Sequence, residues 1–134
     1  MHLPYTTPLT SSFVKVFFPM QIEVMFEFAA AHQLPNHPGR CQRMHGHNYK
    51  LIVAVAGEVD AHTGFVADFS DIENICNEAV LKKVDHTCFN DYLENPTAER
   101  IVQWMWPLLK GRLPGLCELR LFETSACAVV YRGP

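Results

Sequence analysis

Residues 41–49 read CQRMHGHNY and combine the start of a strand with a candidate metal site. His45 and His47 are separated by one glycine, so on an extended strand both imidazoles would point to the same face. Gly46 leaves the opposite face bare, where another backbone or a ligand could approach closely. Cys41 precedes His45 in a loop-like stretch and could reach the same point. Two convergent imidazoles beside a thiol suggest a metal with a nucleophile or a base next to it.

The chain on both sides of this stretch predicts two strands. Residues 21–30 alternate between apolar and polar types, which is typical of a half-buried strand. His32 shares the parity of the apolar side, so it would leave the core side at the end of that strand. A turn-rich loop, residues 34–39, could bring the HGH stretch back beside the first strand. Residues 47–55 are apolar on much of both faces, which suits a strand that is covered on both sides.

The rest of the chain predicts a short strand, two helices and two further strands. Residues 65–67 could form the short strand, and residues 68–84 repeat apolar side chains at helical spacing. That helix could be capped either by Asp68 or by Ser70 acting with Glu73. A second helix begins near 95–97, and the last strands cover 119–123 and 127–131. This order of elements predicts an α+β fold with an antiparallel sheet and helices on one face.

Composition limits the class of protein. The 134 residues are 49% hydrophobic and carry a net charge of −3, which argues for one globular domain and against nucleic acid or an anionic membrane as partner. No apolar stretch approaches the roughly 20 residues that span a bilayer. Five cysteines without metal-knuckle spacing indicate reduced thiols, and hence a cytoplasmic protein. We expect residues 1–20 to be an extension of unknown role and residues 21–134 to be the single domain.

The three histidines His32, His45 and His47 are the best candidate metal ligands. Three imidazoles suit zinc and leave a fourth position open, as in catalytic sites. The alternative is that HGH is a turn with two solvated histidines. Cys41 could be a small buried side chain or a reactive thiol, and the arginines at positions 40 and 43 favour the reactive form.

Two acidic positions add further candidates. Asp85 next to His86 could orient the imidazole as a proton relay, or it could be a polar helix end. Glu123 shares its parity with Leu119 and Leu121, so it lies on the side that should be buried and needs a partner. That partner could be an internal arginine. It could also be a ligand ring with an N–H and an amino group side by side, as in guanine or pterin.

Six ordered stretches resemble the 6-pyruvoyl-tetrahydropterin synthase superfamily, and within it the bacterial 6-carboxy-tetrahydropterin synthases of queuosine biosynthesis. They are FEFAAAHQL at 26–34, CQRMHGHNY at 41–49, TGFVADFSDI at 63–72, VDHTCFN at 84–90, NPTAE at 95–99 and LFETSACAVVY at 121–131. The resemblance implies the tunnelling fold, a four-stranded antiparallel sheet with two helices on one face that assembles around a central barrel. It implies a homohexamer of two trimers, with active sites at subunit interfaces.

The resemblance also implies residue roles. Zinc would bind to His32, His45 and His47, and Cys41 would take the position of the catalytic base. Asp85 and His86 would form the relay pair and Glu123 the pterin anchor, while two residues would help to line the pterin pocket, Thr97 and Glu99.

The implied substrate is a small molecule, 7,8-dihydroneopterin triphosphate. In the 6-carboxy branch the products are 6-carboxy-5,6,7,8-tetrahydropterin, acetaldehyde and triphosphate. The alternative is a 6-pyruvoyl-tetrahydropterin synthase, which eliminates triphosphate and keeps the side-chain carbons. The three-residue gap between Cys41 and His45 resembles the bacterial 6-carboxy type. A non-enzymatic pterin- or zinc-binding module would need the three histidines but neither Cys41 nor His86.

Overall fold

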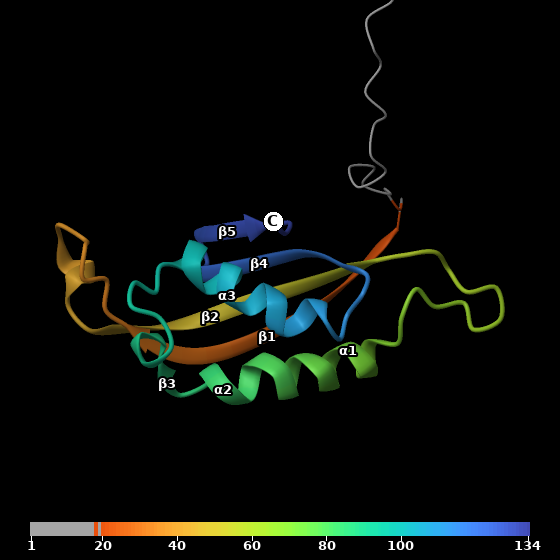
Figure 1. Ribbon diagram of the computed structural model, residues 1–134, viewed down its shortest axis with the longest axis horizontal. Helices are drawn as coiled ribbons and strands as arrows, with labels where there is room; N and C mark the ends of the chain where they lie inside the picture. Colours follow the sequence, from red (N-terminus) through yellow and green to blue (C-terminus); the bar gives the residue numbers. More distant parts are fainter. Residues whose placement is uncertain (1–17, 19) are drawn as a thin grey trace, which may run out of the picture.

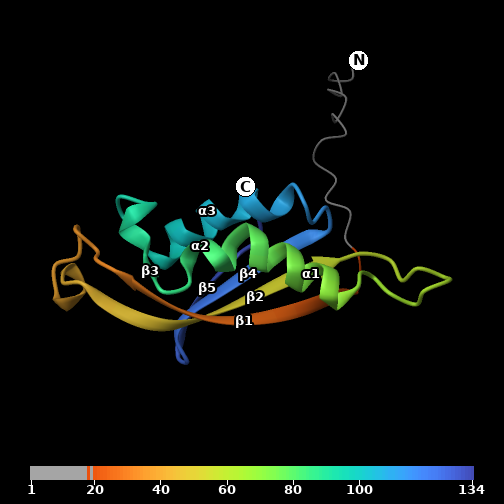
Figure 2. The ribbon, with the colours of Figure 1, turned by 90° about the horizontal axis from the view of Figure 1, so that it is seen from below.

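The computed structural model describes residue 18 and residues 20–134, so nearly all of the extension expected at residues 1–20 lies outside the described residues. The described part forms one sheet with helices on a single face (Figures 1 and 2). The strand order is β3-β1-β2-β4-β5. Their bounds are β1 (Gln21–His32), β2 (His45–Ala56), β3 (Thr87–Cys88), β4 (Leu116–Thr124) and β5 (Cys127–Tyr131). The α+β class predicted from the sequence is confirmed.

A long antiparallel hairpin of β1 and β2 forms the centre of the sheet. Its register runs from Gln21 opposite Ala56 to His32 opposite His45. Alternation along β1 is as predicted: Val24 and Phe28 are buried, whereas the residues between them that face the other way are largely exposed. The hairpin keeps one register over its whole length. The burial of its central residues therefore also determines which face of the sheet the side chains at its two ends lie on.

The prediction of four antiparallel strands is wrong in one respect, because β3 is a fifth strand that runs parallel to β1. It pairs only Thr87 and Cys88 with Ala30 and Ala31. A strand of two residues is too short to show any alternation in the sequence.

The short strand predicted at residues 65–67 is also wrong. The Asp60 carboxylate accepts hydrogen bonds from the backbone N–H groups of His62 and Thr63, at 2.9 and 2.7 Å. The N–H of Asp60 then donates to the carbonyl of Phe65 at 2.9 Å. These bonds close residues 60–65 into a loop, and residues 65–67 form no strand.

The helical segments begin at identifiable caps. The first runs through α1 (Phe69–Cys76), η3 (Asn77–Leu81) and α2 (Lys82–Val84), and the Asp68 side chain caps it by accepting from the Ser70 N–H at 2.8 Å. The second, α3 (Ala98–Lys110), is capped by the Thr97 hydroxyl. In the part of the chain that the structure describes, no helix is sufficiently long and apolar to cross a membrane.

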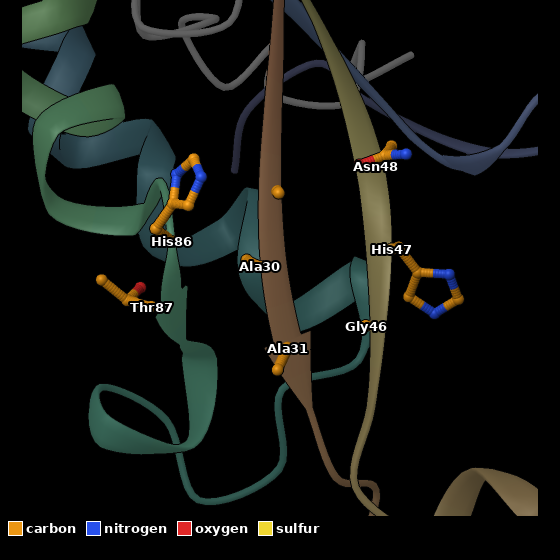
Figure 3. Close-up of a pocket in the computed structure, with 8 residues that line it drawn as sticks. Ala30, Ala31, Gly46, His47, Asn48, His86 and Thr87 are labelled. Carbon is orange, nitrogen blue, oxygen red and sulfur yellow. The ribbon is translucent and has the colours of Figure 1, made fainter.

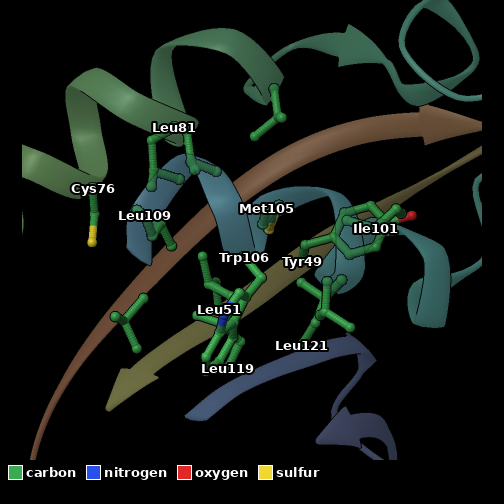
Figure 4. Close-up of a cluster of buried hydrophobic side chains, with 14 of the residues drawn as sticks. Tyr49, Leu51, Cys76, Leu81, Ile101, Met105, Trp106, Leu109, Leu119 and Leu121 are labelled. Carbon is green, nitrogen blue, oxygen red and sulfur yellow. The ribbon is translucent and has the colours of Figure 1, made fainter. Parts of the chain in front are cut away.

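The hydrophobic core lies between these helices and the sheet (Figure 4). Its centre is formed by fully buried side chains from α3, β2 and β4, among them Ile101, Met105, Leu51, Leu119 and Leu121. Tyr49 belongs to the same layer and stacks on Phe28 at a ring-centroid distance of 5.1 Å. The packed layer therefore extends along the hairpin to the end that carries the histidines.

Candidate active site

Three histidines meet at the end of the hairpin where β1 stops and β2 starts. His32 is paired directly with His45, and His47 is paired with Ala30. All three side chains lie on the core side of the sheet, and one ligand atom from each lies within 4.8 Å of the others. His32 is fully buried and the other two are half-buried. His45 and His47 thus belong to a strand, and the interpretation of HGH as a solvated turn is wrong.

Hydrogen bonds to backbone carbonyls fix the tautomers of two of these rings. His32 Nδ1 lies 2.8 Å from the Pro96 carbonyl, and His45 Nδ1 lies 2.8 Å from the Arg43 carbonyl. A carbonyl oxygen can only accept, so each Nδ1 carries the proton and each Nε2 presents a lone pair. Those two Nε2 atoms are 3.0 Å apart. Two lone pairs at this distance repel unless a proton or a metal cation lies between them.

The third ring, that of His47, also has a nitrogen without a hydrogen-bond partner. Among the residues that the structure describes, His47 Nε2 is the only buried side-chain nitrogen or oxygen without a hydrogen-bond partner. An unpartnered buried nitrogen is costly, and metal coordination would satisfy it. The three rings therefore fit a divalent metal, with a fourth position left for a ligand.

Burial sets the protonation of the cluster. It lowers the pKa of His32 and the pKa of His47, while the negative charge of Glu123 opposes both shifts. Neutral imidazole is the form that binds metals, so burial favours the ligating state. The buried Tyr49 hydroxyl lies 3.3 Å from His32 Nδ1, and burial raises the pKa of Tyr49 well above its ordinary value. Tyr49 consequently adds a neutral group and no charge to the centre.

Glu123 and Glu99 line one pocket of about 170 Å³, between the start of α3 and β5. Thr97, which caps α3, directly precedes this pocket wall. Among the described residues, no arginine forms an ion pair with Glu123. Two arginines, Arg120 and Arg132, pair with Glu118 near the start of β4, at 3.3 and 3.1 Å. An internal arginine partner for Glu123 is therefore not found, and its carboxylate remains available to a ligand.

Cys41 lies in η2 (Arg40–Gln42), on the connection between the two histidine-bearing strands. Its side chain is half-buried and unpaired. The backbone carbonyl of Cys41 accepts from the Leu34 N–H at 2.9 Å, which closes the connection into a compact loop. The structure thus brings Cys41 to the same end of the sheet as the three histidines.

The pair Asp85–His86 is formed as the sequence suggested, but on the other side of β1. Asp85 Oδ1 lies 2.9 Å from His86 Nδ1 and also accepts from the Ala29 N–H at 3.1 Å. The His86 N–H donates to the Ala29 carbonyl at 2.6 Å, and its backbone adopts φ +61°. The His86 side chain is 82% exposed. The pair is thus anchored to the outer edge of β1.

A shallow pocket of about 420 Å³ lies across the backbones of β1 and β2, between His86 and His47. Figure 3 shows the His86 ring to one side of β1 and the His47 ring on the far side of β2, pointing away from it. Within one chain, the relay pair and the histidine cluster do not face each other.

Sequence reasoning missed two groups that shape the centre. Tyr49 has the same parity as His47, so the strand pattern could have placed its hydroxyl beside the cluster. The Pro96 carbonyl, which fixes the His32 tautomer, left no signal, because every residue carries a carbonyl and only the tertiary fold brings this one to His32.

Comparison with known proteins identifies the family. The family model described as 6-pyruvoyl tetrahydropterin synthase matches residues 21–134. The chain is 39% identical over 116 residues to the 6-carboxy-5,6,7,8-tetrahydropterin synthase of Synechocystis sp., covering 81% of this chain and 90% of that protein. It is also 39% identical over 138 residues to the Haemophilus influenzae protein of the same name, covering 84% and 98%.

A solved structure, that of Caenorhabditis elegans 6-pyruvoyl tetrahydropterin synthase, matches with a TM-score of 0.79 at 27% sequence identity. The match covers 87% of this chain and 98% of that one. The sheet, the two helical segments on one face and the histidine-bearing hairpin are thus found in a chain that shares sequence and fold with these proteins. The chain adopts the tunnelling fold and belongs to the 6-pyruvoyl tetrahydropterin synthase family of enzymes.

Proposed function

We propose that this chain converts 7,8-dihydroneopterin triphosphate and water into 6-carboxy-5,6,7,8-tetrahydropterin, acetaldehyde and triphosphate. The two relatives at 39% identity carry the name of that synthase. The observation that carries the proposal is the 3.0 Å distance between the Nε2 atoms of His32 and His45, both of which present lone pairs. The negative charge of Glu123 acts on the same centre. The product would enter queuosine biosynthesis in the cytoplasm, with no nucleic acid or membrane as partner.

The metal in this proposal is Zn²⁺, held by His32, His45 and His47. Three neutral imidazoles with one open position are the donor set of several catalytic zinc sites. When bound, zinc supplies Lewis-acid polarisation of the side-chain hydroxyls of the substrate. The carbonyls of Pro96 and Arg43 would hold two of the rings in the orientation that ligation needs.

Glu123 would anchor the pterin ring. Its two carboxylate oxygens can accept from the ring N–H and from the adjacent amino group, a pairing that fixes both distance and orientation. Glu99, which lines the same pocket as Glu123, and Thr97 at the start of α3 would border the same ring. Held in this way, the ring would direct its side chain toward the histidine cluster, which is the positioning contribution to catalysis.

Cys41 would remove a proton from the substrate side chain, and the Asp85–His86 pair would return protons during the later steps. Because that pair lies on the other side of β1 from the cluster in one chain, we propose that a neighbouring subunit supplies it. Among the residues that the structure describes, β3 pairs with only two residues of the twelve-residue strand β1, so most of the outer edge of β1 is unpaired there. Free edges need cover. Three subunits whose sheets close into a barrel would cover these edges. Two such trimers would form the homohexamer.

The second candidate is the 6-pyruvoyl branch, in which triphosphate is eliminated and the side-chain carbons are kept. The likeness to the C. elegans enzyme favours it. The two branches share the metal centre and the pterin anchor, so the product distinguishes them.

The test is mass spectrometry of the products after the zinc-loaded protein is incubated with 7,8-dihydroneopterin triphosphate. Cys41→Ala is compared with Cys117→Ala, a matched thiol deletion near the start of β4. A 6-carboxy product with acetaldehyde, lost only in Cys41→Ala, is the expected result. A 6-pyruvoyl product would move the chain to the second branch, and unchanged substrate would refute both.

A further inference from the structure

The side chain of Asn90 makes an unusual two-point contact with the backbone of Gln33. Asn90 lies in η4 (Phe89–Asp91), directly after β3. Its Oδ1 accepts from the Gln33 N–H at 2.8 Å, and its Nδ2 donates to the Gln33 carbonyl at 2.8 Å. One amide group thus satisfies both backbone groups of one residue, as a neighbouring strand would do.

This contact lies just beyond the end of the pairing between β1 and β3. β3 pairs with β1 only at Ala30 and Ala31, and the chain then turns away into η4. Gln33 is the first residue after β1 and directly follows His32. The Asn90 amide therefore replaces the next pair of the ladder and holds the backbone that carries His32 as it leaves the sheet. Without it, the exposed backbone groups of Gln33 would bond to water and the strand end would fray.

The same contact is linked to Cys41. Leu34, the next residue, donates its N–H to the Cys41 carbonyl at 2.9 Å. A continuous path of hydrogen bonds and one peptide bond thus runs from Asn90 through Gln33 and Leu34 to Cys41. Asn90 thus holds the residue that follows His32, and the next residue along the chain is bonded to the backbone of Cys41.

We propose that Asn90 is a positioning residue that sets the geometry between the His32 imidazole and the Cys41 thiol. The proposal rests on the proposed function, in which the thiol acts on a substrate held at the histidine cluster. Asn90 needs no contact with substrate or metal for this role. A misplacement of about 1 Å can lower a rate by about 100-fold, so a fixed loop base matters for turnover.

A purely structural role for Asn90 predicts a different result. If Asn90 only stabilises the fold, its replacement lowers the melting temperature and leaves zinc affinity unchanged wherever the protein is folded. If Asn90 positions His32 and Cys41, zinc affinity and local amide exchange change at temperatures far below the melting transition.

The experiment uses the full-length protein with Asn90→Asp, which turns the donating amide into a carboxylate facing the Gln33 carbonyl. Asn90→Ala is the second variant, because it removes both bonds without adding charge. Asn74→Asp is the matched control, since Asn74 is exposed on α1. Zinc affinity is measured by competition with a chromophoric chelator, and amide exchange at Gln33 and Leu34 by NMR.

We expect both Asn90 variants to bind zinc about tenfold more weakly, with amide exchange at Gln33 and Leu34 about tenfold faster or more. Their kcat should fall by about tenfold while KM changes less than about twofold, because Glu123 lies on β4 and is not held by this path. Asn74→Asp should match the unmodified protein in each measurement.

Unchanged zinc affinity and unchanged exchange in Asn90→Ala would overturn the proposal. A uniform rise in exchange across the core, with zinc affinity retained, would also overturn it in favour of the structural role. If the unmodified protein bound no zinc or turned over no substrate, the proposed function would fail instead. The positioning of the loop would then be judged by the exchange data alone, with faster exchange confined to Gln33 and Leu34 expected.

Discussion

Removal of the proposed zinc ion should destabilise this protein without unfolding it. The three candidate ligands all lie on β1 and β2, so a bound ion would link only the two strands of one hairpin. The hydrophobic core that joins α3, β2 and β4 is built from other side chains, and among the described residues His32 is the only histidine that is fully buried. A chelator should therefore leave the secondary structure intact at room temperature and abolish turnover.

The size of the change in melting temperature follows from the linkage between zinc binding and folding. Free zinc at 100 times its dissociation constant stabilises the folded state by about 2.7 kcal/mol. For a domain of this size, 1 kcal/mol corresponds to a shift of about 4 °C in the melting temperature. Chelation should thus lower the melting temperature by about 10 °C. The assay is a thermal melt followed by far-UV circular dichroism, at fixed free zinc and with EDTA.

Two variants make this measurement decisive. His45→Ala should lose the zinc-dependent shift, whereas His62→Ala should keep it, because His62 lies in the exposed loop after β2. Loss of the far-UV signal on chelation at room temperature would refute the reasoning, since it would make the ion part of the fold. An equal shift in His45→Ala would show that zinc binds elsewhere.

Three further predictions follow from burial. Because burial lowers the pKa of His32 and of His47, the unfolded chain binds more protons, so the metal-free protein should lose stability as the pH falls below about 6.5. Urea denaturation in EDTA at several pH values tests this, and His47→Gln should reduce the dependence. Leu119→Ala, at a fully buried site, should lower the free energy of unfolding by about 2–5 kcal/mol in the same assay. Burial raises the pKa of Cys76 to about 12, so a thiol reagent should label the exposed Cys127 in the native protein and leave Cys76 unlabelled.

The strand pattern predicted the histidine cluster because that cluster depends on local geometry. His32, His45 and His47 share one face by parity, and a hairpin brings the two strand ends together with no further information. The pattern also placed Glu123 on the core side of its strand, and in the structure Glu123 lines a pocket between β5 and the start of α3.

The position of the Asp85–His86 pair could not be predicted in the same way. It depends on the parallel pairing of β3 with β1, a contact between segments far apart in the sequence that involves only two residues of β3. The Asn90 contact with Gln33 is likewise set by tertiary structure, since one asparagine in a polar stretch has many other uses. Local periodicity thus predicted what lies within a hairpin and not what is attached to its edge.

In the proposed function, His86 is needed for turnover although its backbone conformation is unfavourable for folding. Its φ of +61° lies in the left-handed region, which among the described residues other than glycine occurs at this position only. A glycine there would relieve a backbone cost of about 1 kcal/mol. It would also remove the imidazole. Selection for thermal stability alone should therefore drive this position toward glycine, and retention of histidine in a stabilised variant would mark selection for turnover.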